Sequence, residues 1–173
     1  IQATSGSDVH LTTINAIHDG SDAYITEFAT LKSGSSLASY SADISGLNLR
    51  LLATPASTNS TVFTVSRTLI RASGNSDEVT TTSTAATTIN EFSTSSGSSA
   101  VYIVQAKQGT NVHTTKIHLV HDGTTVSMTE FATVRTGSSL GTFDADISGS
   151  NVRLLATSAS ATSTTYNVNR TLL

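Results

Sequence analysis

The chain contains no cysteine and no tryptophan, a single proline, a single methionine and only 12% charged residues. Without cysteine, neither a disulfide framework nor a thiolate metal site can form. The net charge of −3 argues against a nucleic-acid partner, which would require a basic surface. No apolar run approaches the ~18 residues of a membrane span, so we also expect no membrane partner.

Serine and threonine make up about a third of the residues, and valine, isoleucine and threonine recur in alternating runs. Disordered chains usually combine high net charge with few β-branched residues, and this chain has neither property. Strands with polar, uncharged outer faces fit the composition better. We therefore predict an all-β protein.

One sequence pattern occurs twice, at an offset of 103 residues. Residues 1–70 align with residues 104–173 without a gap, and 38 of the 70 aligned positions are identical. The shared motifs include His18-Asp19-Gly20 with His121-Asp122-Gly123, and Arg67-Thr68-Leu69 with Arg170-Thr171-Leu172. Such a tandem duplication predicts two modules of similar build.

Short alternating runs separated by Gly, Ser and Asp turns predict strands along the whole chain. The expected strands are 9–18, 23–31, 37–44, 49–54, 61–70, 79–93, 100–107, 112–121, 126–134, 140–147, 152–157 and 164–173. Residues 83–90 could instead hold a short turn of helix. About seven strands in about 100 residues is the size of an antiparallel β-sandwich, either Ig-like or jelly-roll-like.

The alignment also predicts the domain boundaries. We expect a first β-sandwich module at 1–70, a polar linker at 71–78 and a complete second module at 79–173. Ile1 aligns with Val104, so the first module has no counterpart of residues 71–103 in this sequence. It should therefore lack one or two strands. Either the sequence is truncated relative to a longer protein, or a neighbouring subunit supplies a strand to the open edge.

Charged side chains interrupt an apolar strand face in both copies. Alternation places Glu27 and Glu130 in the middle of one apolar stripe, and Arg67 and Arg170 in the stripe of the last strand. A buried charge without a partner is costly. We therefore predict two structural ion pairs, Glu27–Arg67 and Glu130–Arg170. The alternative is that the glutamate is a general acid or base, but no second acid or nucleophile accompanies it.

The His-Asp-Gly motifs at His18 and His121 could suggest a metal site. Adjacent residues of a strand point to opposite faces, and zinc needs three or four ligands, so turn formation and surface hydrogen bonding are the expected roles. Calcium binding by Asp19 and Asp22 is an alternative, although Asp22 is replaced by Thr125 in the copy. We predict no metal site and no cofactor.

The repeated Ala-Asp-Ile-Ser-Gly motif places Asp43 and Asp146 opposite an apolar face. A solvated face or a turn cap is the expected role of these two carboxylates. No phosphate loop occurs in the sequence, and no second acid or nucleophile accompanies the repeated glutamates. We therefore predict no catalytic residues and a chain that is not an enzyme.

The longest motif string is Leu119-Val120-His121-Asp122-Gly123-Thr124-Thr125, followed by Thr136-Gly137-Ser138-Ser139-Leu140-Gly141-Thr142-Phe143-Asp144-Ala145-Asp146-Ile147-Ser148-Gly149 and Asn151-Val152-Arg153-Leu154. This string resembles the tandem repeats of virion structural proteins of tailed bacteriophages, especially marine phages of cyanobacteria. The resemblance covers residues 79–173 well and residues 1–70 more loosely. It implies tandem β-sandwich repeats and no catalytic residues.

The resemblance implies a non-enzymatic structural protein of a virion, either a tail or tail-fibre component or a protein that decorates the capsid. Its expected partners are copies of itself, as a homo-oligomer, and other virion proteins, with a host surface receptor as a further candidate. An alternative is a receptor- or glycan-binding adhesin or fibre module, although no tryptophan offers an aromatic platform. A polysaccharide-degrading enzyme is the weakest alternative, because paired carboxylates are not evident.

Overall fold

We describe residues 1–70 and 77–173 of a computed structural model of the chain. These residues form fourteen β-strands and no helix. The predicted all-β class is therefore confirmed. Within the described ranges there is also no helix that could span a membrane. The chain divides into unit 1, Ile1–Leu69, and unit 2, Ile70–Leu173, which are considered separately below.

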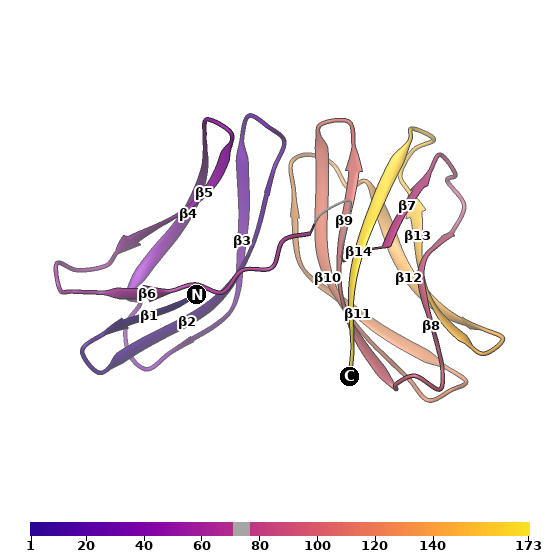
Figure 1. The fold of residues 1–173 in the computed structure, drawn as a ribbon, viewed down its shortest axis with the longest axis horizontal. Coiled ribbons are helices and arrows are strands. Elements are labelled where there is room, and N and C mark those ends of the chain that lie inside the picture. Colours follow the sequence, from indigo (N-terminus) through magenta and orange to yellow (C-terminus); the bar gives the residue numbers. More distant parts are fainter. Residues whose placement is uncertain (71–76) are drawn as a thin grey trace. The chain divides into compact units, whose positions relative to one another are not determined.

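Unit 2 consists of two antiparallel sheets. One sheet has the strand order β11-β10-β9-β14-β7, and the other has the order β12-β13-β8 (Figure 1). The strands are β7 (Asp77–Thr81), β8 (Thr87–Ser93), β9 (Ser99–Gln108), β10 (Asn111–His121), β11 (Val126–Arg135), β12 (Gly141–Ser148), β13 (Asn151–Ser158) and β14 (Thr164–Leu172). The alternating pattern of each strand directs one apolar face toward the space between the sheets, as in a β-sandwich.

The core of unit 2 contains apolar residues from both sheets. Tyr102 and Tyr166 are its largest fully buried side chains, and β13 alternates between buried and half-buried residues along its whole length. The remaining members of the core are Ile89, Phe92, Ala100, Val104, Ala106, Ile117, Leu119, Leu140, Val152, Leu154, Ala156 and Val168. Residues from β8 and from the first half of β9 are therefore integral to this core.

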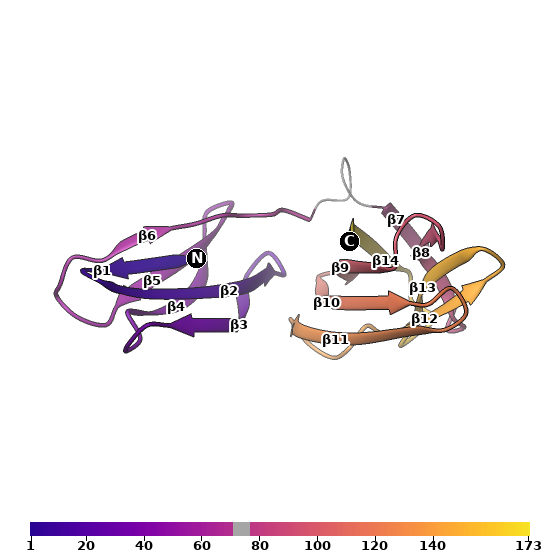
Figure 2. The same cartoon turned by 90° about the horizontal axis from the view of Figure 1, so that it is seen from below.

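Unit 1 is a smaller version of the same arrangement. One sheet has the order β3-β2-β1-β6, which Figure 2 shows from one edge to the other, and the second sheet is the hairpin β4-β5 (Figure 2). The strands are β1 (Gln2–Ser5), β2 (Asp8–His18), β3 (Ala23–Lys32), β4 (Ala38–Ser45), β5 (Asn48–Pro55) and β6 (Val62–Thr64). By sequence alignment, β1 to β6 correspond to β9 to β14 in order.

The two units share a local irregularity. The register between β2 and β3 shifts between Leu11 and Thr13, and the register between β10 and β11 shifts between Thr114 and Lys116. Both shifts are β-bulges, which insert an extra residue into one strand of a pair. Ala29 and Ala132, on the bulged strands, have φ angles of 53° and 55°.

The units differ most in the strands that pair with β5 and with its counterpart β13. In unit 2, β8 pairs with the outer edge of β13, and β7 pairs with β14. In unit 1, β5 pairs with β4 alone, and every residue of β5 is exposed. The buried apolar residues among those described for unit 1 are only Ala3, Ile17 and Ala38. Unit 1 thus has an incomplete core.

Several element boundaries differ from those predicted. The expected strand at 61–70 is reduced to Val62–Thr64, and residues 65–70 form no strand. The expected strand at 79–93 is two strands, β7 and β8, separated by bends rather than by a helical turn. The strand β7 begins at Asp77, inside the predicted linker 71–78, and the rest of that linker lies outside the described residues.

Candidate functional site

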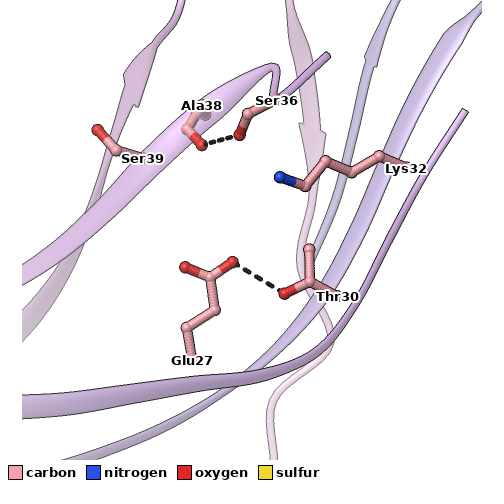
Figure 3. A pocket seen from close by; sticks show the side chains of 6 residues that line it. All are labelled: Glu27, Thr30, Lys32, Ser36, Ala38 and Ser39. Atoms are coloured by element: carbon pink, nitrogen blue, oxygen red, sulfur yellow. Dashed lines mark hydrogen bonds between the residues drawn. The ribbon is translucent and has the colours of Figure 1, made fainter. Parts of the chain in front are cut away.

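A shallow hollow of about 620 Å³ lies between β3 and β4 of unit 1. Glu27, Thr30 and Lys32 line it from β3, Ser36 lines it from the loop before β4, and Ala38 and Ser39 line it from the start of β4. Figure 3 shows the Glu27 carboxylate, the Lys32 ammonium group and the Ser36 hydroxyl around the same space (Figure 3). The lining therefore combines one anionic group, one cationic group and several hydroxyls.

The β-bulge explains why these three β3 side chains share one face. In a regular strand, Glu27 and Lys32 would point to opposite faces, since they lie an odd number of positions apart. The extra residue at Ala29 reverses the alternation, so Thr30 and Lys32 join Glu27. Thr30 Oγ1 donates a hydrogen bond to Glu27 Oε1 at 3.3 Å, and Leu31, predicted on the face of Glu27, is 69% exposed.

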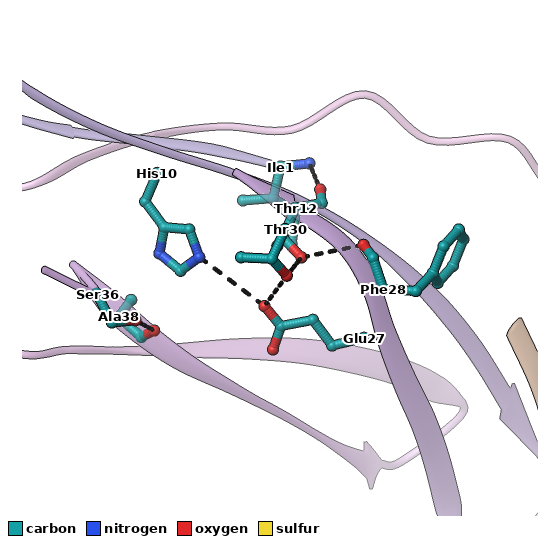
Figure 4. Close-up of polar contacts among 8 residues, drawn as sticks. All are labelled: Ile1, His10, Thr12, Glu27, Phe28, Thr30, Ser36 and Ala38. Atoms are coloured by element: carbon teal, nitrogen blue, oxygen red, sulfur yellow. Dashed lines mark hydrogen bonds and ion pairs between the residues drawn. The ribbon is translucent and has the colours of Figure 1, made fainter. Parts of the chain in front are cut away.

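A buried histidine lies behind the carboxylate. His10 is 1% exposed, and its Nε2 lies 3.9 Å from Glu27 Oε1 (Figure 4). This separation is too long for a hydrogen bond, and neither ring nitrogen of His10 has a hydrogen-bond partner. The Tyr40 ring lies 6.0 Å from the His10 ring, measured between centroids. The buried imidazole thus lies between the Tyr40 ring and the Glu27 carboxylate.

Threonines connect the carboxylate to the backbone of the bulge. Thr12, which is 1% exposed, shares a hydrogen bond of 2.9 Å with Thr30 and donates to the Phe28 carbonyl oxygen at 3.4 Å. Figure 4 shows this chain of contacts from Phe28 through Thr12 and Thr30 to Glu27. The network thus links Glu27 and Thr30 to the Phe28 carbonyl oxygen beside the bulge and gives the buried Thr12 hydroxyl its hydrogen-bond partners.

Unit 2 contains the same group of side chains. Thr133 Oγ1 donates to Glu130 Oε1 at 3.3 Å, and Thr115 shares a 2.8 Å hydrogen bond with Thr133. His113 is 2% exposed and packs against Phe143 with 5.8 Å between ring centroids. Burial, followed by the Arg135 charge, lowers the pKa of His113. The recurrence in both units indicates a structural role for this group in shaping the bulge.

The chemistry available in the hollow of unit 1 is that of polar recognition. Glu27 can accept hydrogen bonds, while Lys32 and the Ser36 and Ser39 hydroxyls can donate them. No group of three or more His, Cys, Asp or Glu side chains with the geometry of a metal site occurs in the described part of the chain. The hollow can therefore be considered for a polar, hydroxylated ligand.

The structure does not bring together the predicted pairs Glu27–Arg67 and Glu130–Arg170. The strands β11 and β14 are separated by β10 and β9 in the sheet, so Glu130 and Arg170 lie about 14 Å apart across three strand spacings. Arg67 follows β6 and is exposed. Arg67 was expected on a strand at 61–70 but lies beyond β6. Alternation also does not give the strand order, which decides which residues meet.

Arg170 instead contacts β8. Its Nη1 donates to Asn90 Oδ1 and to the Glu91 carbonyl oxygen, both at 2.6 Å, and its guanidinium carbon lies 5.5 Å from the centre of the Phe92 ring. Asn90 is buried and also donates to the Asp77 carboxylate. The charge of Arg170 is therefore stabilised by amide and carbonyl dipoles and by an aromatic face.

The ion pairs that do form were missed in the sequence. Asp43 pairs with Arg50, and Asp146 pairs with Arg153, each through two hydrogen bonds of 2.7 and 2.5 Å. These bonds lower the pKa of both aspartates. The expected solvated or turn-capping role of Asp43 and Asp146 is thus incomplete. In both copies, an Asp and an Arg lie opposite each other across a predicted hairpin. This pattern could have predicted the ion pairs from the sequence.

The two His-Asp-Gly motifs form turns, as expected. Asp122 accepts hydrogen bonds from the backbone N–H groups of Thr124 and Thr125 and from the Thr125 hydroxyl, which lowers its pKa to about 2. Asp19 accepts from Ser21 and Asp22 in the same manner. Both carboxylates accept hydrogen bonds from groups of their own turns. The geometry therefore does not support calcium binding at these positions.

Comparisons with known proteins give little further information. No family model matches the chain, and no curated protein is similar to it. Among solved structures, the chain is similar to the tailspike protein of Acinetobacter phage vB_ApiP_P1, with a TM-score of 0.42 and 16% sequence identity. The match covers 64% of this chain and 24% of the tailspike chain. A likeness at this level carries no conclusion about activity or partners.

Proposed function

We propose that the chain is a non-enzymatic structural building block of a tailed-phage virion, in the tail, a tail fibre or the head decoration. It assembles there with other chains that carry the same repeat, including its own copies. The motif string of residues 119–154 and the tandem repeat support the virion assignment.

The observation that carries the proposal is the exposed apolar surface of unit 1. Leu49, Leu51 and Leu52 are 37–40% exposed on a strand whose outer edge has no partner in the described residues. Exposed apolar side chains and a free strand edge favour association with another chain. In a virion, where every subunit is permanently packed against others, such a surface is covered after assembly.

The experiment is to measure the mass of the purified chain in solution by light scattering, over a range of concentrations, with negative-stain images of the same sample. We expect a defined oligomer or a regular filament, because the exposed apolar face of unit 1 drives association of copies. A monomer at every concentration contradicts the assembly role.

A second candidate is a glycan-binding module of a fibre, favoured by the hollow at Glu27. The carboxylate, the Lys32 ammonium group and the Ser36 and Ser39 hydroxyls offer both acceptors and donors to sugar hydroxyls. A glycan array tests this candidate, with a Glu27→Gln variant as the matched control. Binding of a defined glycan that is lost in the variant favours it, whereas an empty array removes it.

A further inference from the structure

We propose that unit 1 is completed by a three-strand segment of the type of residues 77–103, which another copy of this repeat supplies. This inference rests on the proposed function and specifies the partner of the same surface. We call the open face of unit 1 the positions His18, Leu49, Leu51, Val65 and Arg67. In unit 2, the counterparts of all five contact residues 77–103 or lie paired with them.

The edge of β5 is the first element of the open face. In unit 2, β8 pairs antiparallel with Asn151 to Ala156 of β13, including the pairs Val152↔Phe92 and Leu154↔Asn90. The equivalent stretch of unit 1 is Asn48 to Ala53. Pro55, which cannot donate a backbone hydrogen bond, aligns with Ser158 and thus lies beyond the register that β8 occupies. The edge of β5 can therefore accept a strand in the register of β8.

The four-stranded sheet of unit 1 is also only partly paired. The strand β1 pairs with Asp8 to Leu11 of β2, whereas in unit 2 the ladder between β9 and β10 continues to Val120↔Ser99. The residues of β10 that pair with Ser99 to Ile103 correspond to Thr13 to Ile17 of β2. A donor that ends with a strand like Ser99–Ile103 would extend β1 along this part of β2.

The hydrophobic positions of the open face differ sharply from their counterparts. Leu49, Leu51 and Val65 are 37%, 40% and 58% exposed. The equivalent residues of unit 2, Val152, Leu154 and Val168, are 0%, 0% and 2% exposed and belong to its core. In unit 2, this core includes Ile89 and Phe92 of β8. A donor segment must therefore bring two large apolar side chains at these positions.

His18 and Arg67 define the polar groups that the donor must offer. The counterpart of His18 is His121, whose Nδ1 accepts from the Gly123 N–H at 3.1 Å, so its protonated Nε2 donates to the Gly97 carbonyl oxygen at 2.7 Å. His121 also lies against Phe92, at 5.7 Å between centroids. Its counterpart His18 is exposed.

The counterpart of Arg67 is Arg170, which is held by Asn90, Glu91 and the Phe92 ring. Arg67 is followed by the same two residues as Arg170, in the shared motif Arg-Thr-Leu. The donor must therefore supply a side-chain amide, a backbone carbonyl and an aromatic face. Residues 77–103 of this chain carry all of these groups in the required order.

A second copy of the chain is not the donor that we assign. Each chain contains two units that need such a segment and one segment of this type. A copy that donated its residues 77–103 would uncover its own unit 2, so exchange between identical copies leaves the number of open units unchanged. A segment from a repeat other than the one at residues 77–103 avoids this loss.

The test uses the full chain and a synthetic peptide with the sequence of residues 77–103, labelled with fluorescein at its N-terminus. Binding is measured by fluorescence anisotropy, and the site is located by hydrogen exchange. A peptide with Phe92→Ser and a scrambled peptide of the same composition serve as controls. The chain variant Arg67→Ala removes one exposed recognition group without touching the core of either unit.

We expect saturable binding of one peptide per chain, with new protection of the β5 amides. The Phe92→Ser peptide should bind about tenfold more weakly or worse, because aromatic anchors dominate such interfaces, and Arg67→Ala should weaken the native peptide by a smaller factor. No binding up to ~100 μM, a weak affinity on the scale of protein complexes, overturns the inference. Equal binding of the scrambled peptide, or protection confined to β13, also overturns it.

The two proposals fail separately. A chain that is monomeric alone but binds the peptide retains the strand-acceptor inference and loses the self-association role. A chain that forms oligomers but ignores the peptide loses the inference and keeps the structural role. If both hold, the peptide should dissociate the oligomers, since it occupies the surface through which the copies associate.

Discussion

The hydroxyl of Tyr166 lies 2.9 Å from Ser158 Oγ, in the interior of unit 2. A methyl group at Gly141 would lie 2.9 Å from that hydroxyl oxygen and 2.7 Å from the Thr157 carbonyl oxygen. In unit 1, the aligned residues are Phe63, Pro55 and Ala38. In unit 1, Phe63 thus lacks the hydroxyl that Tyr166 carries, and Ala38 has the methyl group that Gly141 lacks.

Gly141→Ala should therefore destabilise unit 2 by about 1–3 kcal/mol, as overpacking of a core does. Tyr166→Phe alone should cost about 1 kcal/mol through the lost hydrogen bond. The double variant should lose less than the sum, because removing the hydroxyl relieves one of the two close contacts. Urea unfolding of the three variants measures this coupling, and strictly additive losses would show that the two positions are independent.

Arg170→Ala should destabilise unit 2 by about 1–3 kcal/mol, because the buried Asn90 then loses a charged hydrogen-bond partner. The matched variant Arg67→Ala should change stability by less than about 0.5 kcal/mol, as exposed substitutions do. Chemical denaturation followed by NMR signals of each unit distinguishes the two. Equal effects would mean that β8 does not hold Arg170 as described.

The stability of unit 2 should fall as the pH is lowered through and below about 6.5, the ordinary pKa of histidine. Burial lowers the pKa of His113 in the folded state, so the unfolded chain takes up a proton at a higher pH than the folded chain does. The contribution of neutral His113 is thus fully present above the unfolded pKa and is lost as the pH falls through the folded one.

The control for this pH dependence is His113→Phe. Neither ring nitrogen of His113 has a hydrogen-bond partner, so a phenyl ring should fit without losing an interaction and should flatten the pH profile between 7.5 and 5. Urea midpoints at the two pH values provide the measurement. A His113→Phe variant with the same slope as the parent would place the titrating group elsewhere.

Ala132→Gly should be neutral or stabilising by up to about 1 kcal/mol, in contrast to glycine substitutions elsewhere in a strand. Ala132 has a φ angle of 55°, a left-handed conformation that costs an L-residue about 1–2 kcal/mol. Ala132→Val should be clearly destabilising, because a β-branched side chain tolerates this conformation poorly. Thermal unfolding of both variants checks the bulge, and the reverse order would argue against it.

Much of the fold could be predicted from the sequence. Alternating β-branched residues and Asp-Gly turns predicted an all-β chain. This prediction is possible because the side chains of a strand alternate between its two faces with a period of two residues, which is visible in the local sequence. The offset between Ile1 and Val104 indicated where unit 1 lacks strands. These features depend on neighbouring residues, or on the comparison of one copy with the other.

The candidate site could be predicted less well, because it depends on strand order and on one inserted residue. The pair Glu130–Arg170 required adjacent strands, but two further strands lie between them. The bulge at Ala29 reversed the face of Thr30 and Lys32. An alanine at position 29 does not predict a bulge. Asp146–Arg153, by contrast, faces across a single hairpin and could have been found.

The most direct test of the strand-acceptor account is hydrogen exchange at β5 and β13 in two chains. One is the present chain, and the other carries an added copy of residues 71–103 fused in front of Ile1. In the present chain, amides of Asn48 to Ala53 should exchange much faster than those of Asn151 to Ala156. In the extended chain, the β5 amides should approach the protection of β13. Unchanged β5 exchange after the extension would contradict the account.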